Sequence, residues 1–473
     1  MSDNGTLVAE RVVPAAHRFE VDVELVRKYS VPAPRYTSYP PATQFTEDVS
    51  RPRLLENIGR NNETTRPLSL YFHLPFCRSL CWYCGCTTVI TTQQEQSAAY
   101  LRDLERELDW MRPHLHPQRE VVQIHFGGGT PTFLLPDEIR RLGAMIRGRF
   151  RIADAVEASV EIDPRVLTRE HVAALREAGF NSASVGVQDH NPAVQRAVHR
   201  IQPFAETKMA VAWLREAGFE SLNVDLIYGL PLQTPETFQR TLEESLWLNP
   251  DRFAVFSYAH VPWMKPAQRI FAEDAMPTSQ TKLAMLKLTV ETLTGAGYGY
   301  IGMDHFARPQ DELCVAQRAR TLQRNFQGYS TCGDADIYSF GMSSISQTPE
   351  IYWQNHKELP LYRGALDAGQ WPVARGCVLT DDDKLRRETI MRLMCDMGLE
   401  FEAMSERLGV DVQKYFAREL ESLEDLEADG LIERTDAGIA VTDAGRLLIR
   451  VIAMRFDAYL AAQKTEKRFS KAI

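Results

Sequence analysis

From residue 68 onward the sequence alternates between short β-branched runs and amphipathic stretches, and this alternation restricts the possible folds more than any other feature. The β-branched runs cover residues 68–74, 121–126, 158–162, 182–187, 222–227 and 252–258. The stretches between them have helical spacing and cover residues 98–111, 136–150, 168–178, 205–217 and 235–246. Strands that alternate with helices of about 12 residues are typical of parallel βαβ units. We therefore expect an α/β fold with a parallel sheet.

The number of units favours a closed or partly closed sheet. Six strand–helix units, with a further strand expected at 298–303, predict a barrel or partial barrel of the (β/α)6 type. No dinucleotide-binding fingerprint opens the first unit, which weakens the doubly wound alternative. Functional residues lie at the carboxyl ends of barrel strands. In this sequence those ends carry the cysteines between residues 77 and 86, the glycines 127–129, Thr130, Glu161, Asp163, Gln188, Asp225, Tyr258 and His260.

The regions on either side of the barrel pattern, which spans residues 67–376, have a different organisation. Residues 1–66 include a Pro- and Tyr-rich stretch at 31–41 that is expected to form an ordered arm or lid. Residues 377–473 are expected to form a mostly helical, winged-helix-like domain, with helices at 380–397, 401–408, 412–429 and 444–461 and a hairpin at 430–434 and 438–441. Residues 381–473 carry 15 Lys and Arg against 20 Asp and Glu, so a DNA-binding role for this domain is disfavoured.

The charge of the whole chain also disfavours nucleic-acid binding. The 473 residues include 54 Lys and Arg against 63 Asp and Glu, which argues against a nucleic acid as partner. No run approaches the roughly 18 apolar residues of a membrane span, and residues 1–20 lack the apolar core of a signal peptide. We expect a cytoplasmic protein, and because nothing in the sequence demands an assembly, we expect a monomer.

Four of the eight cysteines (Cys77, Cys81, Cys84 and Cys86) fall within ten residues, with the spacing CxxxCxxCxC. A zinc site needs a second, distant ligand pair, and nothing downstream supplies one. Three thiolates on one loop can each bind a different iron of a [4Fe–4S] cluster and leave the fourth iron open for a substrate. Cys86 is too close to Cys84 to reach that iron easily, so it is interpreted as a neighbour of the site.

The CxxxCxxC triplet after the first strand resembles the signature of radical S-adenosylmethionine (SAM) enzymes. The flanking motifs resemble those of one family in particular, the oxygen-independent coproporphyrinogen III oxidases, also called coproporphyrinogen III dehydrogenases. These motifs are PRYTSYP (34–40), YFHLPFC (71–77), CGC (84–86), FGGGTPT (126–132), EIDP (161–164), GVQD (186–189), GMDHFA (302–307), RNFQGY (324–329) and FSKAI (469–473). They are independent of one another and extend over almost the whole chain.

The resemblance implies an enzyme of porphyrin and haem biosynthesis. Its reaction would be the oxidative decarboxylation of two propionate side chains of coproporphyrinogen III to vinyl groups, which gives protoporphyrinogen IX. A reduced [4Fe–4S] cluster would split SAM to a 5′-deoxyadenosyl radical, and that radical would remove a hydrogen from the propionate. The substrate would then lose carbon dioxide and pass one electron to an acceptor. The sequence identifies neither the electron donor nor the acceptor.

The resemblance also assigns residues to the cofactors, and it implies no catalytic side chain beyond the cluster and SAM. Cys77, Cys81 and Cys84 would hold the cluster. Two SAM molecules are implied, and the positions that match SAM-binding residues of the family are Tyr71, Tyr83, Gly128, Gly129, Thr130, Glu161, Gln188, Arg200, Asp225, Ala259 and Ile345. Tyr71 would lie beside the first SAM, Tyr83, Gln188, Arg200, Asp225 and Ala259 around the second, and Ile345 along an adenosyl pocket.

Coproporphyrinogen III carries four carboxylates, so arginines are expected to pair with them. The candidates are Arg35, Arg308 and Arg324. Tyr36 and Tyr39 of the arm could cover the tetrapyrrole or pack into the core; both interpretations stay open at this point.

Two other functional classes compete with this interpretation. Relatives of the family bind haem and deliver it as chaperones, without decarboxylating anything. The CxC completed by Cys86, the PRYTSYP arm and the length of the chain all favour the enzyme. A DNA-binding regulator with an iron–sulfur sensor is disfavoured by the acidic carboxy-terminal region.

Overall fold

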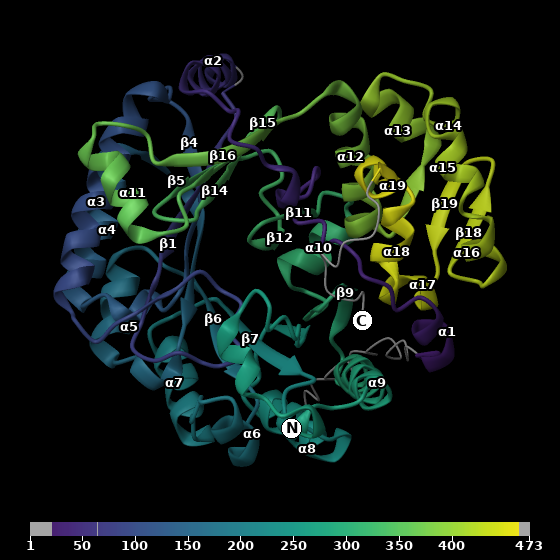
Figure 1. The fold of residues 1–473 in the computed structure, drawn as a ribbon, viewed down its shortest axis with the longest axis horizontal. Coiled ribbons are helices and arrows are strands. Elements are labelled where there is room, and N and C mark those ends of the chain that lie inside the picture. Colours follow the sequence, from purple (N-terminus) through teal and green to yellow (C-terminus); the bar gives the residue numbers. More distant parts are fainter. Residues whose placement is uncertain (1–20, 64, 463–473) are drawn as a thin grey trace, which may run out of the picture.

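A parallel sheet that curves into a partial barrel forms the centre of the computed structural model, which describes residues 21–63 and 65–462 (Figure 1). The six predicted strands are present, they pair in parallel and in chain order, and the α/β prediction is confirmed. They are β1 (Leu68–Leu74), β4 (Glu120–Gly128), β5 (Arg151–Ile162), β6 (Ser182–Gln188), β7 (Ser221–Tyr228) and β8 (Arg252–Ser257). β5 begins seven residues before the predicted start at 158.

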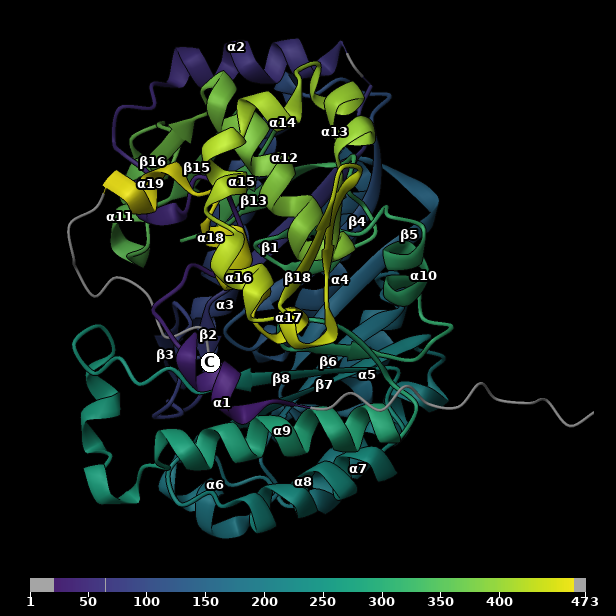
Figure 2. The same ribbon diagram turned by 90° about the vertical axis from the view of Figure 1, so that its right-hand side faces the viewer.

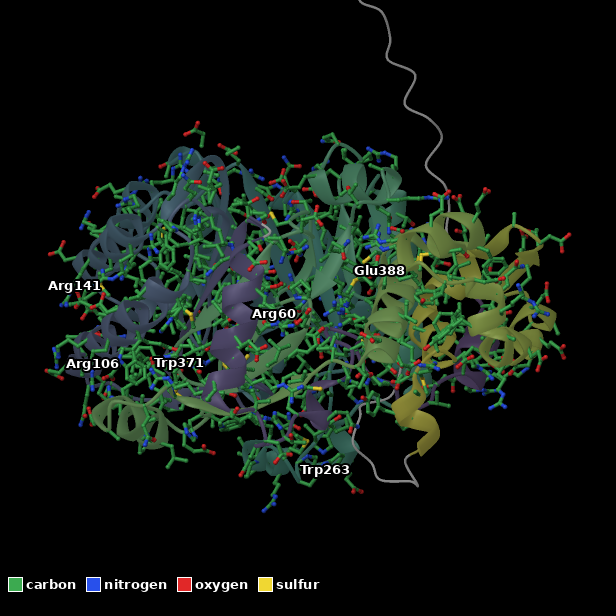
Figure 3. All side chains as sticks on the ribbon, turned by 90° about the horizontal axis from the view of Figure 1, so that it is seen from above. Arg60, Arg106, Arg141, Trp263, Trp371 and Glu388 are labelled. Atoms are coloured by element: carbon green, nitrogen blue, oxygen red, sulfur yellow. The ribbon has the colours of Figure 1, made fainter. Side chains whose placement is uncertain are left out.

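Helices cover the outer face of the sheet, as Figure 1 shows. They are α3 (Glu95–Met111), α4 (Pro136–Arg149), α5 (Arg169–Glu177), α6 (Pro192–Ala197), α7 (Phe204–Glu216), α8 (Pro235–Trp247) and α9 (Ser279–Gly295). Side chains on the outer surface of this layer form exposed ion pairs, such as Arg141 with Glu105 at 2.8 Å (Figure 3). No helix within residues 21–63 and 65–462 is long and apolar enough to cross a lipid bilayer.

Further strands extend the sheet at both edges to twelve strands, in the order β16-β15-β14-β13-β1-β4-β5-β6-β7-β8-β10-β9. β13 (Asp336–Phe340) is parallel to β1. It is followed by β14 (Ile345–Gln347), β15 (Ile351–Asn355) and β16 (Val373–Val378), each antiparallel to the strand before it. Helix α11 (Leu359–Asp367) lies between β15 and β16. At the other edge lie β10 (His305–Ala307) and β9 (Gly299–Gly302), which is the strand expected at 298–303. β16 and β9 are the two ends of the described sheet and do not pair, so the barrel is partial.

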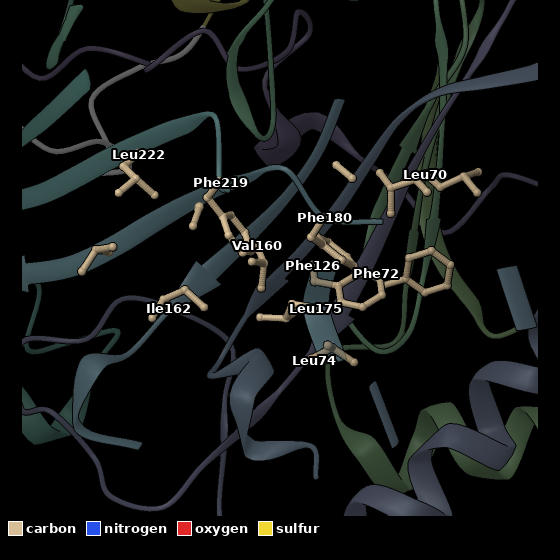
Figure 4. Close-up of a cluster of buried hydrophobic side chains, with 14 of the residues drawn as sticks. Leu70, Phe72, Leu74, Phe126, Val160, Ile162, Leu175, Phe180, Phe219 and Leu222 are labelled. Carbon is tan, nitrogen blue, oxygen red and sulfur yellow. The ribbon is translucent and has the colours of Figure 1, made fainter. Parts of the chain in front are cut away.

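Alternation of side chains along the strands separates the apolar core from a polar interior. Successive strand residues point to opposite faces of a sheet. In β1, Leu70 and Phe72 point toward the helices, where they pack with Phe126 of β4 in one buried cluster (Figure 4). The neighbouring positions, such as Tyr71 and His125, face the inside of the barrel. The sequence therefore builds its hydrophobic core between sheet and helices and leaves the interior polar.

The carboxy-terminal region is helical but more broken than predicted. Helix α12 (Asp381–Asp396) and helix α13 (Phe401–Leu408) match the prediction. The predicted helix at 412–429 is wrong as a single element, because it consists of α14 (Val412–Tyr415), α15 (Ala417–Glu421) and α16 (Glu424–Ala428). The predicted helix at 444–461 likewise divides into α17 (Asp443–Leu447), α18 (Ile449–Met454) and α19 (Ala458–Ala462). The hairpin strands β18 (Ile432–Thr435) and β19 (Gly438–Val441) are joined by β17 (Gly398–Glu400).

The amino-terminal arm packs against the carboxy-terminal region (Figure 1). It follows α1 (Val23–Lys28) and precedes α2 (Arg51–Asn62). Tyr36 and Tyr39 are only 3% and 2% exposed, and the Tyr36 hydroxyl donates to Asp457 at 2.9 Å. The core-packing interpretation of these two tyrosines is therefore the correct one. The FSKAI motif at 469–473 lies outside the described residues.

A buried ion pair lies at the amino ends of the barrel strands and allows a stability test. Arg119 donates to Asp336 of β13 at 2.6 Å, and both side chains are 0% exposed. Loss of one partner from a buried pair leaves an uncompensated charge. Because Arg66 also contacts Asp336, at 3.1 Å, we expect Arg119→Met to lower the free energy of unfolding by about 3 kcal/mol, the lower end for such losses.

Chemical denaturation followed by circular dichroism would measure this difference. The control is Arg141→Met, which removes the exposed pair with Glu105 and should change stability by less than about 1 kcal/mol. Equal losses in the two variants would show that burial of the Arg119 pair does not determine its contribution.

Candidate active site

A cavity of about 730 Å³ opens at the carboxyl ends of the strands and continues down the inside of the barrel. Its upper wall is the loop that carries the four clustered cysteines, and its lower wall is formed by inward-facing polar residues of the strands. These polar residues include Gln123, Ser159, Ser184 and Asn223. The position agrees with the rule that functional residues gather where barrel strands end.

The cysteine loop runs from β2 (Phe76–Cys77) to β3 (Val89–Ile90) and is held from two sides. The Cys77 thiol lies 3.3 Å from the Thr130 hydroxyl, at the end of β4. On the other side, Lys265 donates to the carbonyl oxygen of Cys86 at 2.9 Å, and Gln268 donates to that of Tyr83 at 3.2 Å. Both belong to residues 258–278, the segment between β8 and α9 that extends beyond the body of the molecule in Figure 2. Contacts from the end of β4 and from residues 258–278 thus hold the loop on both sides.

The clustered thiols suit an iron–sulfur cluster. Cys77, Cys81 and Cys84 all line the same cavity. Yet within the described chain no three His, Cys, Asp or Glu side chains are arranged to hold one metal ion. A cluster does not need such convergence, because each thiolate binds a separate iron. Burial raises the pKa of Cys77 to about 11, whereas the Cys86 side chain lowers that of Cys84 to about 6.

The structure brings almost all the expected SAM-binding residues together. Those that line the large cavity are Tyr83, Gly128, Gly129, Thr130, Glu161, Gln188, Arg200, Asp225 and Ala259. A second cavity of about 250 Å³ lies beside it and is lined by Tyr71, Glu161 and Ile345. Glu161 faces both cavities, which places it between the two candidate ligand sites.

Glu161 is held by neighbours that also line these cavities. One of its carboxylate oxygens accepts from the Gly128 amide at 2.9 Å, and the other lies 3.5 Å from the His125 ring. The His125 ring in turn stacks on Tyr71, with 5.7 Å between ring centroids. Burial opposes ionisation of Glu161, but His125 and Gly128 outweigh it and hold its pKa below the ordinary value. The carboxylate is therefore ready to accept from a cationic or hydroxyl-bearing ligand.

The pKa of Asp225 is shifted in the opposite direction from that of Glu161. Burial is the main cause that raises its pKa to about 6, although Ser184 donates to the carboxylate at 2.6 Å and Asn223 at 2.7 Å. Two carboxylates in one cavity thus have pKa values shifted in opposite directions.

Sequence reasoning missed several residues of the site. His73, His125 and Ser343 line the second cavity, and His73 contacts the Tyr71 hydroxyl at 3.0 Å. His73 and His125 sit at inward-facing positions near the ends of two predicted strands, so the alternation along β1 and β4 could have identified them. Ser343 lies between β13 and β14, which were not predicted at all.

The candidate carboxylate-binding arginines divide into two groups. Arg35 forms an ion pair with Asp304, and Arg324 donates to the Arg35 carbonyl oxygen at 3.3 Å. Neither is among the residues that line the cavity, but the Arg35 guanidinium stands over the ring of Phe256 and that of Arg324 over the ring of Tyr329, and both rings line it. The expectation for Arg308 is not supported, because its guanidinium contacts the Pro250 carbonyl oxygen instead of the cavity.

The reason for this position is the direction of β10. It runs antiparallel to β8, so the residue that follows it lies at the amino end of the barrel.

Comparison with known proteins agrees with this geometry. A model of the radical SAM superfamily matches residues 71–244, and one of the HemN C-terminal domain matches residues 379–448. The chain is 44% identical to an oxygen-independent coproporphyrinogen III oxidase from Synechocystis, over 96% of this chain and 98% of that protein. It is 45% identical to the one from Escherichia coli, over 97% and 100%. The chain belongs to the oxygen-independent coproporphyrinogen III oxidase family.

The fold of the family is also present. The solved coproporphyrinogen III oxidase from Escherichia coli, described as a radical SAM enzyme, superimposes with a TM-score of 0.89 at 44% identity, over 94% of this chain and all of that one. Membership of the radical SAM superfamily implies a [4Fe–4S] cluster and SAM. The resemblance drawn from the sequence motifs is thereby confirmed, and the competing chaperone interpretation is not favoured.

Proposed function

We propose that this chain catalyses the oxygen-independent oxidative decarboxylation of two propionates of coproporphyrinogen III to vinyl groups, giving protoporphyrinogen IX. The observation that carries the proposal is that three thiols and the polar residues at the strand ends line one barrel cavity. The chain also matches named oxidases over nearly its full length. When bound, the cluster and SAM supply the radical that removes hydrogen from the propionate. The protein must bind, orient and shield the reactants.

The proposed cluster ligands are Cys77, Cys81 and Cys84, with Cys86 beside them. Cys86 is anchored to this position because its amide donates to the Cys84 sulfur at 3.4 Å. Thiolates of one short loop can bind three irons and leave one open. The open iron is where SAM would attach.

We further propose two SAM sites, one for each group of expected residues. The large cavity offers Gly128, Gly129 and Thr130 at one side and Gln188, Arg200 and Asp225 at the other. Arg200 has an orphaned donor, because its buried Nε atom has no hydrogen-bond partner among the described residues. Tyr71 and Ile345 line the adjacent smaller cavity. The adjacency of two cavities that share Glu161 supports a pair of ligands.

Arg35 and Arg324 are proposed to attract the substrate carboxylates. Arg324 is 3% exposed, and its buried Nη1 atom lacks a hydrogen-bond partner within the described part of the chain. Arg35 keeps 37% of its side chain exposed and lies on the arm. Carboxylates pair strongly with guanidinium groups.

The remaining organisation is proposed as follows. We propose three regions: 1–66, which contains the arm at 31–41; 67–376, the partial barrel with its extensions; and 377–473, the carboxy-terminal domain. The match of the carboxy-terminal family model to residues 379–448 supports the last boundary. Thiolate ligands that must remain reduced suit the cytoplasm. We propose a monomer that exchanges electrons with a separate donor and acceptor.

The decisive experiment is anaerobic reconstitution with iron and sulfide, followed by incubation with coproporphyrinogen III. We expect formation of the divinyl product only when both SAM and a reductant are present. Chromatography of the porphyrin products would measure it. A chain that binds haem tightly in parallel titrations but releases no vinyl product under strict anoxia would be a chaperone instead.

A further inference from the structure

Two arginines and one aspartate surround the sulfur of Cys81. The Arg165 guanidinium lies 3.6 Å from this sulfur and the Arg200 guanidinium 3.7 Å, both within hydrogen-bond distance for a sulfur acceptor. Asp163 accepts from both of them. We call these three side chains the Cys81 clamp. No other clustered cysteine has a guanidinium donor at its sulfur among the described hydrogen bonds.

The clamp is rigid because the ends of two strands hold it. Asp163 follows β5 and caps the short 3-10 helix η4 (Pro164–Val166), while Arg165 within that helix donates back to it at 2.6 Å. Arg200 donates to the carbonyl oxygen of Gly186 in β6 at 2.7 Å. Asp163 and Arg200 are 9% and 7% exposed. Contacts with the ends of β5 and β6 therefore set their positions.

The clamp carries a net positive charge at a buried position. Burial opposes ionisation of Asp163, but Arg200 and Arg165 outweigh it and hold the pKa of its carboxyl below the ordinary value. Two guanidiniums thus share one carboxylate. A charge in such a partly desolvated place interacts with its neighbours more strongly than it would in water.

These contacts matter for electron transfer to a cluster bound at Cys81. Reduction adds one negative charge to the cluster, and both net charge and hydrogen bonds to the sulfurs set the reduction potential of iron–sulfur clusters. We propose that the Cys81 clamp raises the reduction potential of the cluster, with Arg165 as its dedicated donor and Asp163 as the opposing charge. The inference rests on the proposed function, since it assumes a cluster at Cys77, Cys81 and Cys84.

Arg165 is the residue that isolates this effect. Arg200 is also a proposed SAM contact, so its replacement would alter two properties at once. Arg165 also lines the large cavity but is not among the proposed SAM contacts, and its side-chain hydrogen bonds among the described residues are three to Asp163 and one to Cys81. If Arg165 only held the η4 turn in place, its replacement would leave the reduction potential of the cluster unchanged.

The test is an anaerobic redox titration of the reconstituted full-length protein without SAM, followed by electron paramagnetic resonance. We expect Arg165→Gln to reduce the ratio of reduced to oxidised cluster about tenfold at a fixed potential, a shift of about 59 mV toward negative values for one electron. Asp163→Asn should shift the ratio in the opposite direction, because it removes the opposing negative charge. Arg165→Lys keeps the charge and should restore most of the potential.

Arg78→Gln is the matched control. Arg78 is next to Cys77 but exposed, and it donates to Gln94 at 3.0 Å instead of to a sulfur. Its loss should change the ratio less than twofold, since solvent screens its charge.

Three results would overturn the inference: no shift in Arg165→Gln, equal shifts in Arg165→Gln and Arg78→Gln, or shifts of the same sign in Arg165→Gln and Asp163→Asn. Failure of Arg165→Gln, Arg165→Lys and Asp163→Asn to bind iron would also overturn it, because the clamp would then be part of the cluster cage. If the unmodified chain formed no cluster, the proposed function would fail instead.

Discussion

Replacement of Cys81 by alanine is expected to abolish cluster binding and turnover together. Cys81 is buried at the wall of the large cavity and would supply one of three iron ligands. With two ligands left on a short loop, a cubane cluster has no stable attachment. Iron content after anaerobic reconstitution should fall from about four atoms per chain to near zero. Formation of the divinyl product should fall below about 1% of the unmodified value, because the cofactor carries the chemistry.

The matched control for this change is Cys332→Ala. Cys332 is a half-buried free cysteine near β12 (Gly328–Ser330), and it does not line either described cavity. Its replacement should leave iron content and turnover within about twofold of the unmodified protein. Retention of a full cluster in Cys81→Ala would mean that another side chain, most directly Cys86, can take its place, and the proposed ligand set would be wrong.

The sequence predicts the part of the fold and site that depends on local pattern. Period-two alternation along β1, β4, β5, β6 and β7 sets which residues enter the barrel, so strand ends such as Glu161 and Asp225 could be assigned before the structure was known. The cysteine spacing likewise lies within one loop. These signals need no knowledge of which segments are neighbours in space.

Features that depend on long-range packing could not be predicted in this way. Strands β13 to β16 have three to six residues each and are defined by pairing with β1 and with each other. The burial of Tyr36 and Tyr39 requires the carboxy-terminal region, where Asp457 pairs with Tyr36 across 421 positions of the chain. Arg308 lies at the amino end of the barrel because β10 runs antiparallel to β8, and this direction cannot be read from the residues of β10 alone.

The contacts of the Cys81 clamp could likewise not be predicted from local sequence pattern. Asp163 was recognised as a strand-end residue, but the approach of Arg165 and Arg200 to one sulfur follows from the turn after β5 and the segment after α6. The cluster ligands come from one loop, whereas the residues that would tune the cluster come from two other parts of the barrel.

Gly128→Ala is expected to weaken SAM binding while leaving the cluster in place. Gly128 ends β4 with a φ of +114°, a conformation that costs other residues on the order of 1–3 kcal/mol. A Cβ atom there would lie 2.5 Å from the ring of His73. That ring cannot move freely, because it contacts the Tyr71 hydroxyl at 3.0 Å and the Thr87 carbonyl oxygen at 2.9 Å. The clash must therefore displace the residues around both cavities.

The expected loss of SAM affinity follows from the contacts that Gly128 makes. The Gly128 amide donates to Glu161, the carboxylate between the two cavities, so a shift of this residue disturbs a proposed SAM ligand as well as the space it occupies. We expect SAM affinity to fall at least tenfold, about 1.4 kcal/mol, as measured by equilibrium dialysis on the reconstituted protein. Iron content should be unchanged, since the cysteine loop is anchored through Thr130, Lys265 and Gln268.

Gly179→Ala separates backbone strain from the clash. Gly179 has a φ of +93°, but a Cβ atom there would meet nothing within 4 Å. It follows α5 and lies at the opposite end of the barrel from the cysteine loop, before β6 begins. Both variants should therefore lose stability through strain, of order 1–3 kcal/mol, but only Gly128→Ala should lose SAM affinity. Equal SAM affinities in the two variants would show that the close approach of Gly128 to His73 does not shape the ligand site.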